Sequence, residues 1–186
     1  MEKISNLEQK ELLQKSEISI WLDNYNDIFS VFDSRHYLER ALSVDFLDEI
    51  KRASRDKPSG GLSLNMLIPI KQRNTTHETL IKKRLKEHFK KHTDILEKDQ
   101  GELVWQGIYF LFFGLIFMSV AAYILFFYHD KINFFKEFLI VLLEPGGWFL
   151  FWEGLALIIF ETKKIKPDLV FYRKMSKADL VFHTYK

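Results

Sequence analysis

The feature that most constrains this chain is a long uncharged stretch, residues 103–128, which reads LVWQGIYFLFFGLIFMSVAAYILFFY. A helix rises ~1.5 Å per residue, so ~20 such residues cross the hydrocarbon core of a bilayer. A soluble helix of this length would carry a polar stripe, and this stretch has none. Trp105 and Tyr128 lie near its ends, as interfacial anchors do. We therefore predict a first transmembrane helix over residues 103–128, with Gly107 and Gly114 offering small faces for helix contact.

A second apolar stretch, residues 134–160, is less regular, and a break interrupts it at Pro145, Gly146 and Gly147. Proline removes an amide donor and clashes with the preceding turn, and glycine weakens a helix further. We predict an external loop over residues 129–137 and a second transmembrane helix over residues 138–160, hinged at these three residues. A re-entrant loop is the competing geometry.

Two carboxylates, Glu144 and Glu153, lie within this second stretch. A charge at membrane depth is costly, and such residues usually face a bundle interior or a water path. In an oligomer they would form acidic rings that line a cation pathway. The alternative is a structural role, in which they hydrogen-bond to Trp, Tyr or Ser in a packed bundle.

Lysine and arginine predict the orientation. They are frequent in residues 82–102 and 163–177, whereas the predicted loop holds only Lys131 and Lys136. Loops rich in these residues stay on the cytoplasmic side. We expect a multi-pass protein of the inner (plasma) membrane, in contact with the lipid bilayer, with both termini in the cytoplasm.

The rest of the chain predicts a cytoplasmic α+β domain of two or three strands and two to three helices, fused to the transmembrane hairpin. A polar N-terminal segment, residues 1–15, precedes the domain, which covers residues 16–100. Alternation predicts strands over residues 17–22 and 62–68. Helical periodicity covers residues 34–55, with Ser43 as an internal cap, and residues 76–98. The tail, residues 161–186, adds a third strand over 179–185 that returns to the sheet.

So small a domain builds a thin core, and its sheet has exposed edges. We therefore expect a homo-oligomer. A cationic cluster close to the membrane suits anionic lipid or a phosphate-rich ligand, such as a nucleotide or oligonucleotide. The cluster comprises Lys82, Lys83, Arg84, Lys86, Lys90 and Lys91.

Three weaker patterns favour ordinary surface roles. His88 and His92 have the i, i+4 spacing of a two-histidine metal pair but no third ligand. Arg73 and His77 resemble the Arg-spacer-His signature of HEPN ribonucleases, with a shorter spacer. An acidic run, Asp23, Asp27 and Asp33 with Arg35, does not fit a calcium loop. Tyr25 occupies a ligand position, and Ile28 replaces the glycine. The chain has no cysteine, phosphate-binding loop or nucleophile–base motif, so we expect no enzyme, metal or cofactor.

Three segments carry a wider resemblance: IWLDNYNDIFSVFDSRHYLERALSVDFLDEIKRA, TTHETLIKKRLKEHFKKH and EPGGWFLFWEGLALIIFETKK. Together they resemble an uncharacterised family of small prokaryotic two-pass membrane proteins, which implies a cytoplasmic head, a membrane hairpin and a returning tail. The layout is also similar to that of the channel effector of the Hailong anti-phage defence system.

These observations predict an oligomeric membrane channel or pore, gated through its cytoplasmic domain, that serves as an anti-phage defence effector. The alternative is a membrane anchor or scaffold that recruits a soluble protein partner through the same domain.

Overall fold

The structure is a computed structural model that describes residues 17–33, 35, 39–57, 61–127 and 133–185. The chain divides into two compact units, which we describe separately. The first comprises Met1–Asp94 and Leu169–Lys186, and the second comprises Ile95–Asp168. The N-terminal segment and most of the loop between the apolar helices lie outside the described residues.

The first unit contains three strands, β1 (Glu17–Trp21), β2 (Ser63–Pro69) and β3 (Asp179–Tyr185). Both strand pairs are parallel, so the unit is an α/β domain rather than the predicted α+β domain. The 3₁₀ turn η1 (Tyr25–Ile28) and helix α2 (Val44–Ser54) connect β1 to β2. After η2 (Ile70–Gln72), α3 (Thr75–Phe127) leaves the domain, and α5 (Thr162–Lys177) returns to it. The connection between β2 and β3 therefore contains all the apolar helices.

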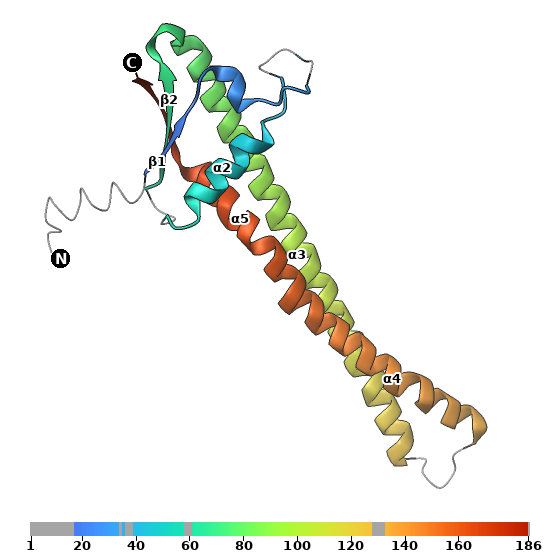
Figure 1. Ribbon diagram of the computed structural model, residues 1–186. Helices are drawn as coiled ribbons and strands as arrows, with labels where there is room; N and C mark the ends of the chain where they lie inside the picture. Colours follow the sequence, from blue (N-terminus) through green and yellow to red (C-terminus); the bar gives the residue numbers. More distant parts are fainter. Residues whose placement is uncertain (1–16, 34, 36–38, 58–60, 128–132, 186) are drawn as a thin grey trace, which may run out of the picture. The chain divides into compact units, whose positions relative to one another are not determined.

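The strands lie in the order β1-β2-β3, with Ile18 paired to Leu64 and Leu64 to Leu180. Crossovers between parallel strands are right-handed, and both crossovers here step in the same direction. Their helices therefore fall on one face of the sheet, as Figure 1 shows for α2, α3 and α5.

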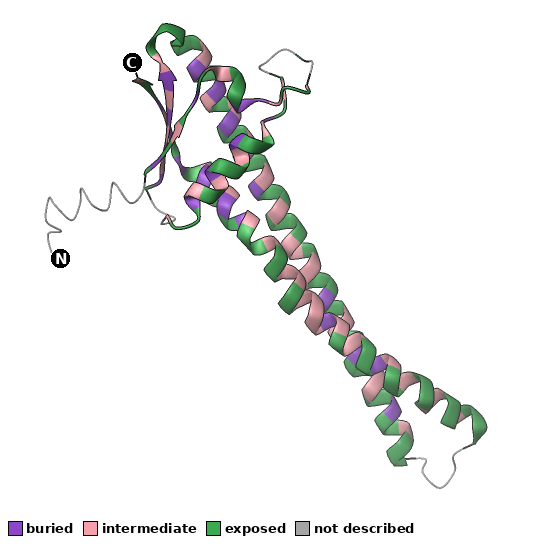
Figure 2. Cartoon of the chain, viewed as in Figure 1, coloured by how far each residue is buried: buried purple, intermediate pink, exposed green. Residues whose placement is uncertain are grey.

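The core fills the space between the sheet and these helices, where Figure 2 shows the buried residues. Alternate residues of β2 point into it, so Leu64, Met66 and Ile68 are fully buried while their neighbours are half-buried. No described helix covers the other face of the sheet, and there the Trp21 side chain is 66% exposed.

The three predicted strands are confirmed to within one residue, and Ser43 caps α2 by accepting from the Phe46 amide. The predicted helix over residues 34–55 is wrong over residues 39–43, because α2 begins only at Val44, and residues 34 and 36–38 lie outside the described residues. Residues 39–43 form a turn and an extended segment, in which Leu42 bridges to Phe29. Asp33 fixes this segment by accepting from the Ala41 amide at 2.8 Å.

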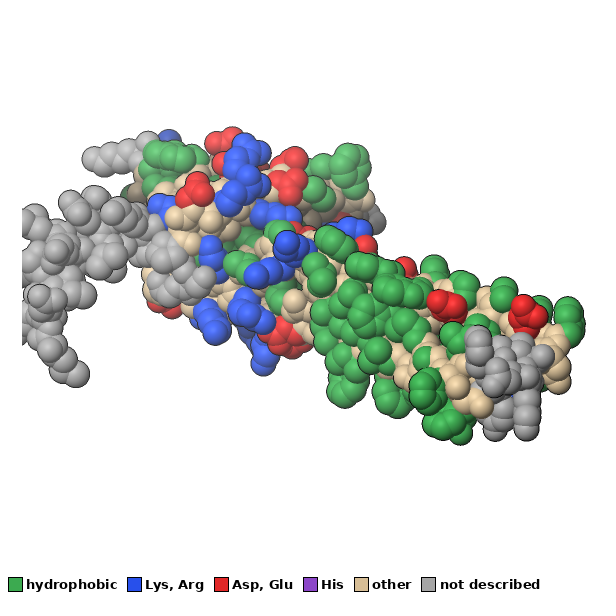
Figure 3. Space-filling model, turned by 90° about the horizontal axis from the view of Figure 1, so that it is seen from below, with side chains coloured by type: hydrophobic (Ala, Val, Ile, Leu, Met, Phe, Trp, Pro, Cys, Tyr) green, Lys and Arg blue, Asp and Glu red, His purple; other side chains and the backbone are tan. Residues whose placement is uncertain are grey.

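The second unit contains two helices that are long and apolar enough to cross a membrane, Thr75–Phe127 and the continuous helical segment Phe134–Lys177. Only 11% of the most apolar window of each is buried, unlike the core helix of a soluble protein. In Figure 3, hydrophobic side chains cover these helices, and Lys and Arg gather on the first unit.

The predicted break at Pro145, Gly146 and Gly147 is wrong. Helix α4 (Phe134–Ala156) runs through all three residues and bends along its length (Figure 1). It begins inside the predicted loop, where Asn133 caps it by accepting from the Lys136 amide. The regular helix changes only later, at a π-helical turn, η4 (Leu157–Glu161), before α5. Such turns are rare and often mark functional positions.

Candidate functional site in the apolar helices

Two glycine pairs bring α3 and α4 into backbone contact. A Cβ atom built on Gly114 would lie 2.8 Å from the Gly147 carbonyl oxygen, and one on Gly154 would lie 2.7 Å from that of Gly107. Real Cβ atoms do not come so close, so only glycine fits here. The spacing is seven residues in each helix, which is the repeat of a left-handed helix pair. The predicted contact faces at Gly107 and Gly114 are confirmed.

The glycines also correct the role of the proline–glycine segment. Gly147 is buried in the contact, whereas a Cβ on neighbouring Gly146 would meet nothing nearer than 3.9 Å. A proline within a helix bends it without always ending it. Thus Gly147 is a packing residue within a continuous helix.

The register given by these pairs sets the depth of the two carboxylates. Gly147 lies opposite Gly114, close to the middle of the uncharged residues 103–128. At ~1.5 Å per residue, Glu144 lies ~4.5 Å along the helix from this middle level and Glu153 ~9 Å on the other side. Glu144 is therefore the carboxylate that lies nearer the middle of the uncharged stretch.

The continuous helix also sets the directions of the carboxylates. Nine helical residues correspond to a rotation of about 180° over a straight helix, so Glu144 and Glu153 project to opposite sides of α4. Glu144 is exposed and Glu153 is half-buried. Neither has a hydrogen bond or ion pair with another described residue.

Aromatic side chains extend the stripe of Glu144. Trp148 and Trp152 follow it at i+4 and i+8, and their rings are stacked with centroids 6.4 Å apart. Both are large exposed residues, at 49% and 61%. An indole N–H donates a hydrogen bond, so this stripe carries two donors ~6 and ~12 Å along α4 from the acceptor Glu144.

The predicted cationic cluster divides into two groups in the structure. The Arg84 guanidinium lies 5.2 Å from the centre of the Phe29 ring, and the Lys82 ammonium lies 5.7 Å from that of Phe182. These two pack on the domain. The exposed outer face of α3 carries the other four lysines, which are Lys83, Lys86, Lys90 and Lys91.

His88 and His92 lie together with ring centroids 4.0 Å apart, and Tyr172 from α5 stacks on His92 at 5.0 Å. The buried Nε2 of His88 has no hydrogen-bond partner among the described residues. Burial and then neighbouring His92 lower the pKa of His88 to about 4. Among the described residues no group of three metal-binding side chains occurs. The pair therefore connects α3 to α5 by packing.

Arg73 and His77 both make contacts within the domain, and the His77 ring lies edge-on to Tyr25 with centroids 6.2 Å apart. The Arg73 Nε lies 3.1 Å from Oε1 of buried Glu78, and Arg73 donates to the Phe182 carbonyl oxygen at 3.3 Å. The Tyr25 hydroxyl donates to the same Glu78 oxygen at 3.1 Å. Pattern analysis of the sequence missed Glu78 because its role depends on groups distant in sequence.

The acidic run is likewise used within the domain. Asp27 accepts from the amides of Asp23 and Asn24, at 2.7 and 3.0 Å, and so caps η1. Arg35 binds Asp33 at 2.7 Å, and this hydrogen bond holds the pKa of Asp33 well below its usual range.

Together these observations define a small parallel α/β domain joined to a closely packed pair of apolar helices that carries two carboxylates. Comparison of the chain with protein-family models, curated proteins and solved structures finds no match.

Proposed function

We propose that this chain is a two-pass membrane protein that assembles into an ion-conducting pore, gated through its cytoplasmic domain. The observation that supports this most is Glu144, exposed near the middle of the apolar helix pair with no partner among the described residues.

The energetic argument concerns what surrounds Glu144. A carboxylate at the centre of a bilayer costs roughly 2.5–3.5 kcal/mol even on insertion scales. A single copy that spans the membrane would turn this group toward lipid. An oligomer that places Glu144 around a water-filled axis removes the cost and creates an acidic ring, which favours cations.

The opposite directions of the two carboxylates assign them different roles in this pore. Glu144 forms the ring at the axis, and half-buried Glu153 packs near the cytoplasmic end of the span. The lysines that flank both apolar segments keep the termini in the cytoplasm of a cell with a plasma (inner) membrane. Depolarisation by such a pore would suit an anti-phage effector.

Gating needs a connection between the domain and the pore. Helix α3 supplies one, because it continues from the domain into the apolar segment without interruption. An anionic ligand such as a nucleotide or oligonucleotide, bound by the exposed lysines of α3, is the proposed trigger.

Planar-bilayer recording of the purified protein tests the proposal. We expect cation-selective currents, and we expect Glu144→Gln to reduce both cation selectivity and conductance. Glu137→Gln, at the exposed first turn of α4, is the matched control and should behave as wild type. Currents of unchanged selectivity in Glu144→Gln would rule out the ring, and silent bilayers under every anionic ligand tested would count against the pore.

The open face of the sheet favours a second candidate function, an anchor that recruits a soluble protein. Parallel sheets are normally covered on both faces. Here exposed Trp21 contacts Tyr185 at 4.5 Å on the uncovered face. A soluble protein captured at equal stoichiometry by wild type and lost in Trp21→Ser, together with silent bilayers, would favour this function.

A further inference from the structure

We infer that the cytoplasmic domains contact one another around the oligomer. In each contact, an acidic hollow of one copy receives the lysine face of α3 from the next. This inference rests on the proposed oligomer but concerns a separate surface.

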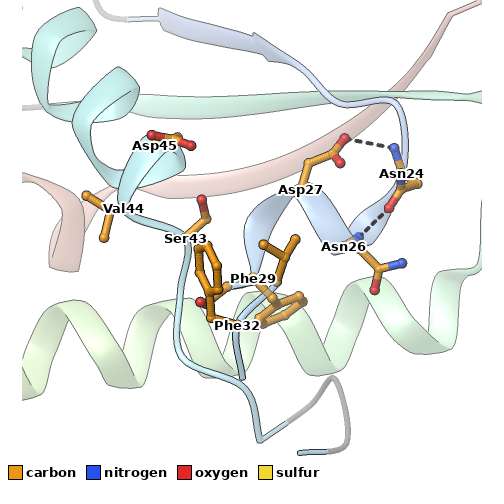
Figure 4. A pocket seen from close by; sticks show the side chains of 10 residues that line it. Asn24, Asn26, Asp27, Phe29, Phe32, Ser43, Val44 and Asp45 are labelled. Atoms are coloured by element: carbon orange, nitrogen blue, oxygen red, sulfur yellow. Dashed lines mark hydrogen bonds between the residues drawn. The ribbon is translucent and has the colours of Figure 1, made fainter. Parts of the chain in front are cut away.

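The hollow lies between η1 and the start of α2 and has a volume of about 620 Å³. Figure 4 shows Asn24, Asn26 and Asp27 on one side of it and Ser43 and Asp45 on the other. The described residues that line it include two carboxylates and no lysine or arginine.

Apolar side chains at the rim give this hollow the character of a protein-binding surface. Phe32 is 96% exposed, Val31 is 79% exposed and Val44 is 71% exposed, and all three line the hollow. A cluster of exposed apolar residues rimmed by polar ones typically marks a protein–protein site. Aromatic anchors dominate the affinity of such sites.

Charge complementarity identifies the occupant as a second copy of the chain. The acidic hollow needs a basic partner with methylene groups that cover apolar side chains, as lysine stems do. The chain itself presents such a surface, on exposed Lys83, Lys86, Lys90 and Lys91 of α3. Because hollow and lysine face are different surfaces, the contact is head-to-tail, which closes into a ring when the rotation permits.

The contact also explains how an anionic ligand would act. The same lysines that bind the ligand would bind the neighbouring hollow, so a ligand would compete with the contact between domains. Ligand binding would then change the arrangement of the domains that gates the pore.

Cysteine crosslinking in membranes is the direct test, because the chain contains no cysteine of its own. We expect the double variant Val44→Cys with Lys90→Cys to give a ladder of crosslinked oligomers on mild oxidation. We expect neither single variant to give more than a trace of dimer. Strong dimer from Val44→Cys alone would replace the head-to-tail contact with a two-fold one and overturn the inference.

Charge-reversal variants, measured by the same crosslinking, provide a second test of the contact. Asp45→Lys should abolish the ladder, and adding Lys86→Glu should restore it in part. Asp48→Lys, one turn further along α2 and outside the hollow, is the matched control and should leave the ladder intact.

The apolar rim is tested in the same way. Phe32→Ser should weaken the ladder, while Ile70→Ser, at an exposed apolar residue elsewhere, should not. Equal ladders in all of these variants would overturn the inference.

Crosslinking and recording separate this contact from the pore. Currents without a ladder would refute the contact and leave the pore standing. A ladder without currents under every anionic ligand tested would support the ring of domains and refute the pore.

Discussion

Glu78 is the most deeply buried carboxylate among the described residues, at 4% exposure, and its contacts explain why this charge is tolerated. Arg73 and Tyr25 both bind its Oε1 atom, each at 3.1 Å. They come from the segments that follow β2 and β1, so Glu78 ties together the carboxyl ends of two strands.

Replacing Glu78 with Ala should destabilise the α/β domain by about 1–3 kcal/mol, because Arg73 and Tyr25 lose a charged partner in a partly buried place. Thermal unfolding of the full chain in detergent measures the change. Glu87→Ala removes an exposed carboxylate that lies 4.0 Å from Lys83 and should cost less than about 0.5 kcal/mol. Equal effects of the two variants would show that Glu78 is not structural.

His88 makes the domain sensitive to acid. Its pKa is about 4 in the folded chain, below the ordinary value of 6.5, because burial disfavours the charged ring. The unfolded chain therefore takes up this proton first as the pH falls, and stability present above pH 6.5 is lost between pH 6.5 and 4.

We expect the unfolding temperature to fall over this pH interval and the fall to be smaller in His88→Gln. The control is His183→Gln, an exposed position on β3, which should retain the wild-type pH dependence. If His88→Gln has the same acid sensitivity as wild type, another group is responsible.

Among the elements, the α3–α4 pair depends on glycine rather than on bulk hydrophobicity. In the proposed membrane setting lipid would be as apolar as the helices, so burial would give little drive for their association, and close backbone packing would supply it instead. The structure places Gly107 against Gly154 and Gly114 against Gly147 for this purpose.

Gly147→Ala should destabilise the helix pair by about 1–3 kcal/mol, because its Cβ would lie 2.9 Å from the Gly114 carbonyl oxygen and 2.7 Å from Met118 Cγ. Gly146→Ala, where the nearest atom is 3.9 Å away, should be neutral or slightly stabilising. Unfolding of both variants in detergent, followed by circular dichroism, compares them. A Gly146→Ala variant as damaged as Gly147→Ala would contradict the packing.

On the scale of the whole molecule, the segment with the two long apolar helices is inserted into the crossover between two paired strands, β2 and β3. The domain therefore needs chain from both ends of the sequence. Phe171, Met175, Leu180 and Phe182 from the returning segment are all in its core.

A fusion that joins residues 17–94 to 169–185 through a flexible linker should fold as a soluble domain, whereas residues 17–94 alone should not. Residues 17–94 alone lack β3 and the core side chains of α5, and β2 is then unpaired on one edge. Dispersion of amide signals in NMR spectra distinguishes the two. A folded 17–94 piece would show that β3 is dispensable.

The sequence by itself determined the elements that local pattern controls. The alternation in residues 179–185 predicted β3, and the uncharged residues 103–128 predicted one long apolar helix, because side-chain periodicity and length report directly on burial. The cap at Ser43 was also predictable, since capping is local.

Only the tertiary structure decided the rest. Pro145 and two glycines predict a broken helix by local preference, but packing of Gly147 against Gly114 stabilises a continuous one. The sequence left Glu144 and Glu153 equivalent, whereas the register of the glycine pairs distinguishes their depths. Likewise, the role of Glu78 depends on Tyr25, which lies 53 positions away and which no local pattern connects to it. The physical reason is the same in each case: long-range contacts outweigh local preference wherever close packing or a buried charge is involved.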